Sequence, residues 1–430
     1  MSKDDKQQEY LETIKSIQES ILKFLEEETN CEENLTFLKD IFNDLEIQDN
    51  RIEFMSVLHL ISKIANNFHR SCNFFSKIEQ ILQYLKADIK KNISNSEIFN
   101  IFHGNKKILL FLAEEGIMTF DEYVIRKITM TNKLVEANYP QYFQPEIEPF
   151  MQEQWFPRYN FHNCVQTQNE WVYELKEEVP ENFYAKRKKG ENDDILCEMI
   201  RNDMVEDFIA YVTRSNTSLD ATIQLSIFET NPFLIKKQTE KQQIQYYGEK
   251  EAKQRGITLI EYAVFFGSIQ IYNYLRLEKV QLTPSLWNFA VHGKNADLIH
   301  SLEDCHVSLE GGAYMQLFYE SIKCHHNDIA NYFLSNFLRK EEENLQKAFI
   351  KSLRYYNFAF LNDEQINESS FYDLCKYDYS ALIGSFVTST AIDINKKEIF
   401  PQFAHVISYA RIFTSFQVAC FNKIWNHMFQ

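Results

Sequence analysis

The segment GITLIEYAVFFGSIQIYNYL, from Gly256 to Leu275, is the strongest indication of the fold of this chain. Its apolar spacing predicts a first helix that presents Leu259 and Ala263 inward, because these positions lie on one helical face. Gly267 follows where the chain must reverse, and the residues after it continue the helical spacing. The small side chain of Ala263 allows the second helix to approach the first closely. The segment therefore predicts one helix–turn–helix unit.

Counterparts of the four inward positions of this unit recur along the chain. After the reference unit at Leu259, Ala263, Ile271 and Leu275, three copies follow at successive intervals of 27, 31 and 31 residues. Another copy lies 63 residues upstream of the reference unit, and a compressed copy follows the last of the three after 23 residues. In chain order the copies stand at Leu196, Ile200, Phe208, Val212; Leu286, Ala290, Leu298, Leu302; Leu317, Ser321, Ile329, Phe333; Ala348, Ser352, Phe360; and Phe371, Cys375, Ile383, Val387. A period of this length predicts an α-solenoid of stacked antiparallel helix pairs over residues 192–395.

The composition agrees with an all-α fold. Only 10 of the 430 residues are glycine and 8 are proline, about 4% against roughly 12% in average proteins. A β-sandwich needs frequent turn residues and a nucleotide-binding α/β fold needs glycines at its phosphate turns, so neither is expected. With 36 Phe and 23 Tyr, the sequence predicts helices around an aromatic-rich core.

Regions on either side of the repeats have their own patterns. Residues 1–135 are predicted to form a helical amino-terminal domain of short amphipathic hairpins, with a helix end at Gly116. Residues 136–191 hold five of the eight prolines among many aromatic residues, which predicts an ordered connector of short helices or irregular chain. An aromatic groove for a peptide is the alternative for this connector. Residues 396–430 are predicted to form an apolar carboxyl-terminal helix.

The repeat unit resembles the ankyrin repeat, whose motif G-x-T-P-L-H-x-A…G-H-L-E-I-V-x-x-L is similar to the 256–275 segment. The order of helical region, connector and array also resembles a large protist family of divergent ankyrin proteins. Leu259 stands where ankyrin repeats have proline, and Glu261 where they have histidine. We therefore expect the usual Thr–His hydrogen bonds to be missing and stability to depend on apolar burial. The array is degenerate.

The sequence contains no motif that indicates catalysis. Nucleotide loops, HExxH and GxSxG are absent, and Cys305-His306 with Cys324-His325-His326 has no spacing typical of a zinc site. His325 is expected instead at a turn between helices, and no cofactor or metal is expected. The basic run at 186–189 is consistent with a nuclear signal or a contact for an acidic partner, but it is more typical of a solvated helix end.

The ankyrin resemblance implies a non-enzymatic scaffold that binds a protein partner through the turns and concave face of its solenoid. The candidate contact positions are the turn residues that precede each repeat glycine or its counterpart: Phe265, Phe266, His292, Gly293, Lys323, Cys324, Tyr377 and Asp378. The pair Phe265-Phe266 is the strongest candidate, because two aromatic residues at a turn either pack against the next repeat or bind.

Charge and cysteine usage limit the other functions. The 45 Lys and Arg against 61 Asp and Glu give a net charge of −16, which argues against nucleic-acid binding. No run of about 20 residues lacks charge, so no integral membrane segment is expected. Eight scattered cysteines and a polar start predict reduced thiols in the cytoplasm, with the nucleus as the alternative. Further alternatives are an enzyme with a dispersed site, a peripheral membrane or self-associating protein acting through residues 400–429, and a family copy without a specific activity.

Overall fold

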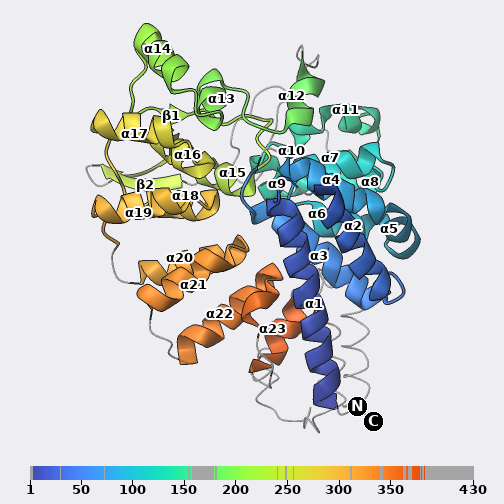
Figure 1. Cartoon of the computed structure of the whole chain (residues 1–430). Helices are drawn as coiled ribbons and strands as arrows, with labels where there is room; N and C mark the ends of the chain where they lie inside the picture. The colour runs from blue at the N-terminus through green and yellow to red at the C-terminus, as the bar shows by residue number, and fades with distance from the viewer. Residues whose placement is uncertain are drawn as a thin grey trace. The chain divides into compact units, whose positions relative to one another are not determined.

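A computed structural model describes residues 3–382 apart from 30, 72, 154, 157–178, 180–181, 240, 247–248, 255, 310–311, 339–341, 362–364, 367–369, 378 and 380–381. The described chain is all-α, as predicted, with helices along most of its length (Figure 1). The predicted helix at 396–430, Asp378 and the last repeat positions Ile383 and Val387 lie outside the described residues. No helix in the described ranges is both long and apolar enough to span a bilayer.

The chain divides into two compact units. One comprises Met1–Leu60 with the chain from Leu334 onward, and the other comprises Ile61–Phe333. The first unit contains α1 (Lys3–Glu26), α2 (Cys31–Asp44), the start of α3 (Arg51–Asn67), α22 (Glu342–Tyr355), η2 (Phe358–Phe360) and α23 (Phe371–Lys376). The two units are described separately below.

In the first unit, the amino-terminal helix packs against a segment about 340 residues further along the chain. The side-chain nitrogen of Gln18 on α1 donates to Asn357 Oδ1 at 2.9 Å, and the backbone N–H of Phe358 donates to Gln18 Oε1. Lys15 donates to the carbonyl of Leu361 at 2.9 Å. Because Gln18 and Asn357 are fully buried, these bonds satisfy polar groups that would otherwise destabilise the core.

The second unit begins with short amphipathic helices, as the apolar spacing predicted. In order they are α4 (Phe74–Tyr84), α5 (Lys86–Asn92), α6 (Asn95–Phe102), α7 (Lys106–Glu114), α8 (Glu122–Met130) and α9 (Asn132–Glu136). Ser94 and Glu97 form a capping box at the start of α6, and Asn105 caps α7. Gly116 has a φ of +63°, the left-handed conformation that ends α7 where the sequence predicted a helix end.

The described part of the connector is ordered and made of short helices. It contains α10 (Tyr139–Tyr142), α11 (Gln144–Ile147), η1 (Glu148–Phe150) and α12 (Phe183–Lys189). Each of the first three has a proline in its first turn, where the missing N–H is tolerated. Tyr142 and Phe143 are fully buried, so the aromatic residues pack as core in this part of the connector.

The repeat region of the second unit consists of successive helix pairs. They are α13 (Ile195–Arg201) with α14 (Val205–Ser215), α16 (Leu259–Phe266) with α17 (Ile269–Leu277), α18 (Leu286–Gly293) with α19 (Ala296–Asp304), and α20 (Ala313–Lys323) with α21 (Asn327–Asn336). The first helices contact one another in chain order, α13 with α16, α16 with α18 and α18 with α20, and Figure 1 shows the later pairs in succession. Between α14 and α16 lies α15 (Pro232–Thr239).

The inward positions read from the sequence are buried across these pairs. Leu259, Ala263, Ile271 and Leu275 are each 1% exposed or less. Of their counterparts on the other pairs of this unit, all but the half-buried Leu196 are buried: Ile200, Phe208, Val212, Leu286, Ala290, Leu298, Leu302, Leu317, Ser321, Ile329 and Phe333. The predicted register is therefore confirmed on this face of the helices.

The turns between paired helices share one backbone conformation. Gly267 has a φ of +69°, and Lys294 and His325, at intervals of 27 and 31 residues, have φ of +49° and +58°. Asp203, at the upstream turn, has a φ of +50°, and Tyr356 in the first unit has a φ of +54°. Only one of these five positions is glycine, which explains how a chain with so little glycine makes regular turns.

The hydrogen bonds of Glu261 add to the apolar burial on which the repeats were expected to depend. Thr258 caps α16 by accepting from the backbone N–H of Glu261, and Glu261 Oε2 accepts in return from the N–H of Thr258 at 3.0 Å. The hydroxyl of Ser285, in the next repeat, donates to Glu261 Oε1. A carboxylate at the histidine position thus forms the capping box and the link to the next repeat.

Short antiparallel strands accompany the helices. β1 (Thr222–Ile223) pairs with β4 (Ile257–Thr258), which leads into α16. β2 (Lys241–Tyr246) pairs with β3 (Glu249–Gln254), with Lys241 opposite Gln254. This second hairpin lies with β1 and α15 between α14 and α16, where the interval between two copies is longest.

Candidate functional site

The two aromatic residues of the first predicted turn have different environments. Phe265 is 4% exposed and its ring stacks nearly parallel to that of Phe233, with centroids 5.8 Å apart. Phe266 is half-buried and packs edge-on against Phe265 and at an angle to Tyr262. Phe265 therefore packs in the core, and Phe266 is the residue of this pair that lies partly at the surface.

The predicted positions His292 and Cys324 belong to a buried polar cluster. His292 Nε2 lies 2.8 Å from Glu320 Oε1, and Lys323 forms an ion pair with the same carboxylate. Cys324 Sγ lies 3.5 Å and 3.6 Å from the two ring nitrogens of His292. The ring of Phe233 stacks on His292 at 3.8 Å.

The cluster has the residue types of a cysteine nucleophile with a histidine base, but its electrostatics oppose that chemistry. Burial raises the pKa of Cys324 well above its ordinary value, and the Glu320 charge raises it further. Burial lowers the pKa of His292 to about 4, although its hydrogen bond to Glu320 acts in the opposite direction. The thiol therefore stays protonated, whereas a reactive cysteine needs a depressed pKa.

The other predicted positions also have definite places. Gly293 ends α18, where an added Cβ would lie 2.8 Å from the carbonyl oxygens of Val264 and Phe265. Its role is the close approach of α18 to α16. Tyr377 is half-buried and its carbonyl accepts from the hydroxyl of Tyr356. In the described ranges, no group of three or more His, Cys, Asp or Glu side chains could hold a metal ion.

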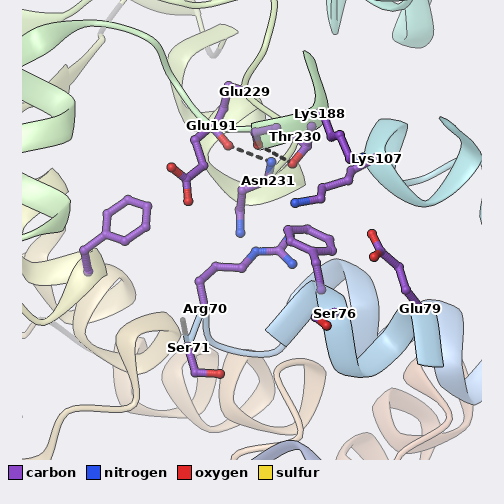
Figure 2. Close-up of a pocket in the computed structure, with 13 residues that line it drawn as sticks. Arg70, Ser71, Ser76, Glu79, Lys107, Lys188, Glu191, Glu229, Thr230 and Asn231 are labelled. Atoms are coloured by element: carbon purple, nitrogen blue, oxygen red, sulfur yellow. Dashed lines mark hydrogen bonds between the residues drawn. The ribbon is translucent and has the colours of Figure 1, made fainter. Parts of the chain in front are cut away.

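A cavity of about 240 Å³ lies in the second unit and brings together residues that the sequence did not single out. Its walls come from α4 and the chain before it, the start of α7, the end of α12, the loop before α15 and the end of α16 (Figure 2). It is lined by Arg70, Ser71, Phe75, Ser76, Glu79, Lys107, Lys188, Gly190, Glu191, Glu229, Thr230, Asn231 and Phe266. Phe266 is the predicted contact residue that reaches it.

Arg70 is the most unusual group in the cavity wall. Both terminal nitrogens of its guanidinium are shielded from solvent and have no hydrogen-bond partner among the described residues. The group stacks on aromatic rings instead, with its central carbon 4.2 Å from the ring centre of Phe75 and 4.9 Å from that of Phe74. Burial lowers the pKa of Arg70 from 12.5 to about 10, while Glu229 and Glu191 oppose this shift. Arg70 therefore stays charged at neutral pH.

Lys107 shares the ring of Phe75 with Arg70. Its ammonium lies 4.3 Å from the ring centre and donates to the carbonyl of Lys189 at 3.1 Å, at the end of α12. Gly190 follows with a φ of +69°, and a Cβ there would lie 2.9 Å from Lys107 Cδ. Glycine at this position thus allows the lysine side chain to run past the backbone into the cavity.

The predicted solvated helix end at 186–189 is only partly correct. Lys186 pairs with Asp193 at 2.8 Å and Lys189 with Glu198 at 3.0 Å, both at the surface. Arg187 is buried and forms two hydrogen bonds to Glu146. Lys188 lines the cavity. The helix end therefore faces solvent on one side and the core on the other.

The loop before α15 is fixed by its own hydrogen bonds. The N–H of Asn231 donates to Glu229 Oε1 at 2.8 Å, and Asn231 Oδ1 accepts from the N–H groups of Phe233 and Leu234. The Thr230 hydroxyl donates to the carbonyl of Gly190 at 2.7 Å. The oxygen of Asn231 is occupied by these bonds, which directs its amide nitrogen toward Arg70 (Figure 2). The loop is a rigid support for the cavity.

Nothing in the sequence marked Arg70 as functional. It is a single cation after an amphipathic helix, and the residues that enclose it, Gly190 and 229–231, are more than 100 residues away. Its only signal is a positive charge beside several aromatic residues. The described chain is all-α, and its second unit contains a cavity lined by Arg70. Comparison with protein-family models, curated proteins and solved structures found no match for the chain.

Proposed function

We propose that this protein is a non-enzymatic scaffold that binds a partner protein along the turns of ankyrin-like helix pairs, with Phe266 as the central contact. Support comes from the recurrence of one left-handed turn conformation at Asp203, Gly267, Lys294 and His325. Regular turns on stacked helices form an extended row of loop ends, and such rows are the surfaces through which repeat proteins bind.

Phe266 has the properties of an aromatic anchor. It is half-buried, and its ring is oriented by Tyr262 and Phe265 with centroids 4.8 Å and 4.9 Å away. A partner that covers this ring gains apolar burial at little cost in side-chain entropy, because the neighbouring rings already limit its motion. The buried Phe265 supports the ring and does not face a partner.

A matched pair of variants tests this function. Phe266→Ser removes the anchor, whereas Leu277→Ser removes a side chain that is 75% exposed at the end of α17, away from the turn. Each full-length variant is immobilised and used for quantitative affinity capture from a native extract of the source cells, beside the wild-type chain. Melting temperatures are measured in parallel, so that loss of folding is not mistaken for loss of binding.

We expect a protein captured by the wild-type chain to be retained by Leu277→Ser and depleted at least about tenfold by Phe266→Ser, the size of effect typical of an aromatic hot spot. If the wild-type chain and both variants capture the same proteins in equal amounts, the turn at Phe266 is not a contact site.

A further inference from the structure

We propose that the cavity at Arg70 is a binding site for a small carboxylic acid, with the Arg70 guanidinium as the group that holds the carboxylate. The small acid is a different ligand from the partner protein of the proposed function. The site shares only the rim residue Phe266 with the proposed contact surface.

The unpartnered guanidinium is the first reason for this assignment. Buried polar groups are nearly always hydrogen-bonded, and a buried charge without a partner is strongly disfavoured. Both terminal nitrogens of Arg70 lack a partner within the described chain, and Arg70 is one of the residues that line the cavity. A planar acid with two oxygens matches the planar fork of these two nitrogens and would satisfy both at once.

Neighbouring donors add to the fit. In Figure 2 the side-chain nitrogens of Asn231 and Lys107 point into the same space as the Arg70 guanidinium. Phe75 holds both cations, at 4.2 Å and 4.3 Å from its ring centre, so neither must be ordered when a ligand binds. A preorganised set of donors binds more tightly, because the cost of fixing them has already been met in folding.

The acidic residues of the cavity decide between kinds of anion. The cavity is lined by three carboxylates and three cations. The carboxylates are Glu79, Glu191 and Glu229, and the cations are Arg70, Lys107 and Lys188. These carboxylates would repel a phosphate dianion more strongly than a carboxylate ligand, because the carboxylate carries a single negative charge. Glu191 is engaged by Arg201 at 3.1 Å, and burial raises the pKa of Glu229. The balance near Arg70 therefore favours a monoanion.

The size and walls of the cavity limit the rest of the ligand. A volume of about 240 Å³ is below the 300–1,000 Å³ of most ligand pockets, so the acid is small, on the order of ten non-hydrogen atoms. Phe75 and Phe266 provide apolar walls, which suit a flat apolar body. Benzoate has this size and shape and serves as the probe, and benzamide is its neutral counterpart.

The experiment measures binding to the full-length chain by equilibrium dialysis and by thermal shift, at constant ionic strength set with sodium chloride. Benzoate, benzamide and inorganic phosphate are compared on the wild-type chain, Arg70→Met and Arg214→Met. Arg214 is exposed at the end of α14 and provides a matched loss of one positive charge. Far-UV circular dichroism checks that each variant is folded.

We expect benzoate to bind with one site per chain and to raise the melting temperature of the wild-type chain and Arg214→Met. Binding to Arg70→Met should be at least about tenfold weaker, since a charge-assisted pair of hydrogen bonds is lost. Equal shifts with benzoate and benzamide on the wild-type chain would overturn the site without reference to any variant. Stronger binding of phosphate than of benzoate would overturn the carboxylate assignment, as would unchanged benzoate binding to a folded Arg70→Met.

Discussion

Glu261 offers the sharpest test of how the repeats are held together. Its carboxylate is 1% exposed and accepts two hydrogen bonds, one from the N–H of Thr258 within its own repeat and one from the hydroxyl of Ser285 in the next. Glu261→Gln keeps the shape of the side chain but replaces one oxygen with an NH2 group. That group cannot accept, so one of the two donors loses its partner.

The size of the effect follows from these two bonds. A hydrogen bond to a charged group contributes about 1.5–3 kcal/mol. We therefore expect Glu261→Gln to lower the local free energy of unfolding by about 2 kcal/mol. Ser285→Ala should lower it by about 1–2 kcal/mol, because Glu261 Oε1 is then left without that donor. In the double variant the two losses should fall short of their sum by about 1 kcal/mol, since the residues share one bond.

The local free energy is measured by native-state hydrogen exchange of peptides from α16 and α18, which reports opening of these helices separately from the rest of the chain. Glu278→Gln is the control, because Glu278 is exposed at the end of α17. Equal effects of Glu261→Gln and Glu278→Gln, or full additivity of Glu261→Gln with Ser285→Ala, would refute the proposed link between repeats.

Three further outcomes follow from the geometry. Gly293→Ala should destabilise the chain by about 2 kcal/mol because its Cβ would meet backbone oxygens at 2.8 Å, whereas Gly312→Ala, with open space, should change urea midpoints little. Iodoacetamide should label the half-buried Cys305 in the native protein and Cys324 only after unfolding, since burial raises the Cys324 pKa; rapid native labelling of Cys324 would contradict this. Burial lowers the pKa of His292 from 6.5 to about 4. Between these two pH values the unfolded chain therefore binds a proton on this histidine that the folded chain does not. The contribution of neutral His292 to stability is complete above pH 6.5 and falls by up to about 1.4 kcal/mol per pH unit below that value. Urea midpoints at pH 7 and pH 5 measure this loss, and equal midpoints would contradict the prediction.

Sequence periodicity was sufficient for the helices and their inner faces. Leu259 and Ala263 are buried as predicted, because a helix in contact with a neighbour must place apolar side chains at a spacing of three or four residues. The same spacing says nothing of which distant segments meet. The contact of Gln18 with Asn357 has no local signal, since both are polar residues whose burial depends on each other.

The candidate site was much less accessible to sequence reasoning. Phe265 and Phe266 are identical neighbours in the sequence, and only the position of Phe233 shows that the first is core. Arg70 gains its significance from the loss of solvent and of partners, which depends on residues 229–231 and on the glycine at 190. Burial of this kind is a property of the assembled fold, so a motif search would not detect it.

The left-handed turns at Asp203, Lys294 and His325 have a consequence for how the protein folds. A residue other than glycine in this conformation costs about 1–2 kcal/mol, with aspartate penalised less than lysine. An isolated helix pair has little buried area to offset that cost, whereas a pair between two neighbours has burial on both sides. Each helix pair is therefore unstable alone, and the pairs between α13 and α21 form as one cooperative block. Deleting a terminal pair would also remove the burial between that pair and its neighbour, so the loss of stability would exceed the stability of the isolated pair.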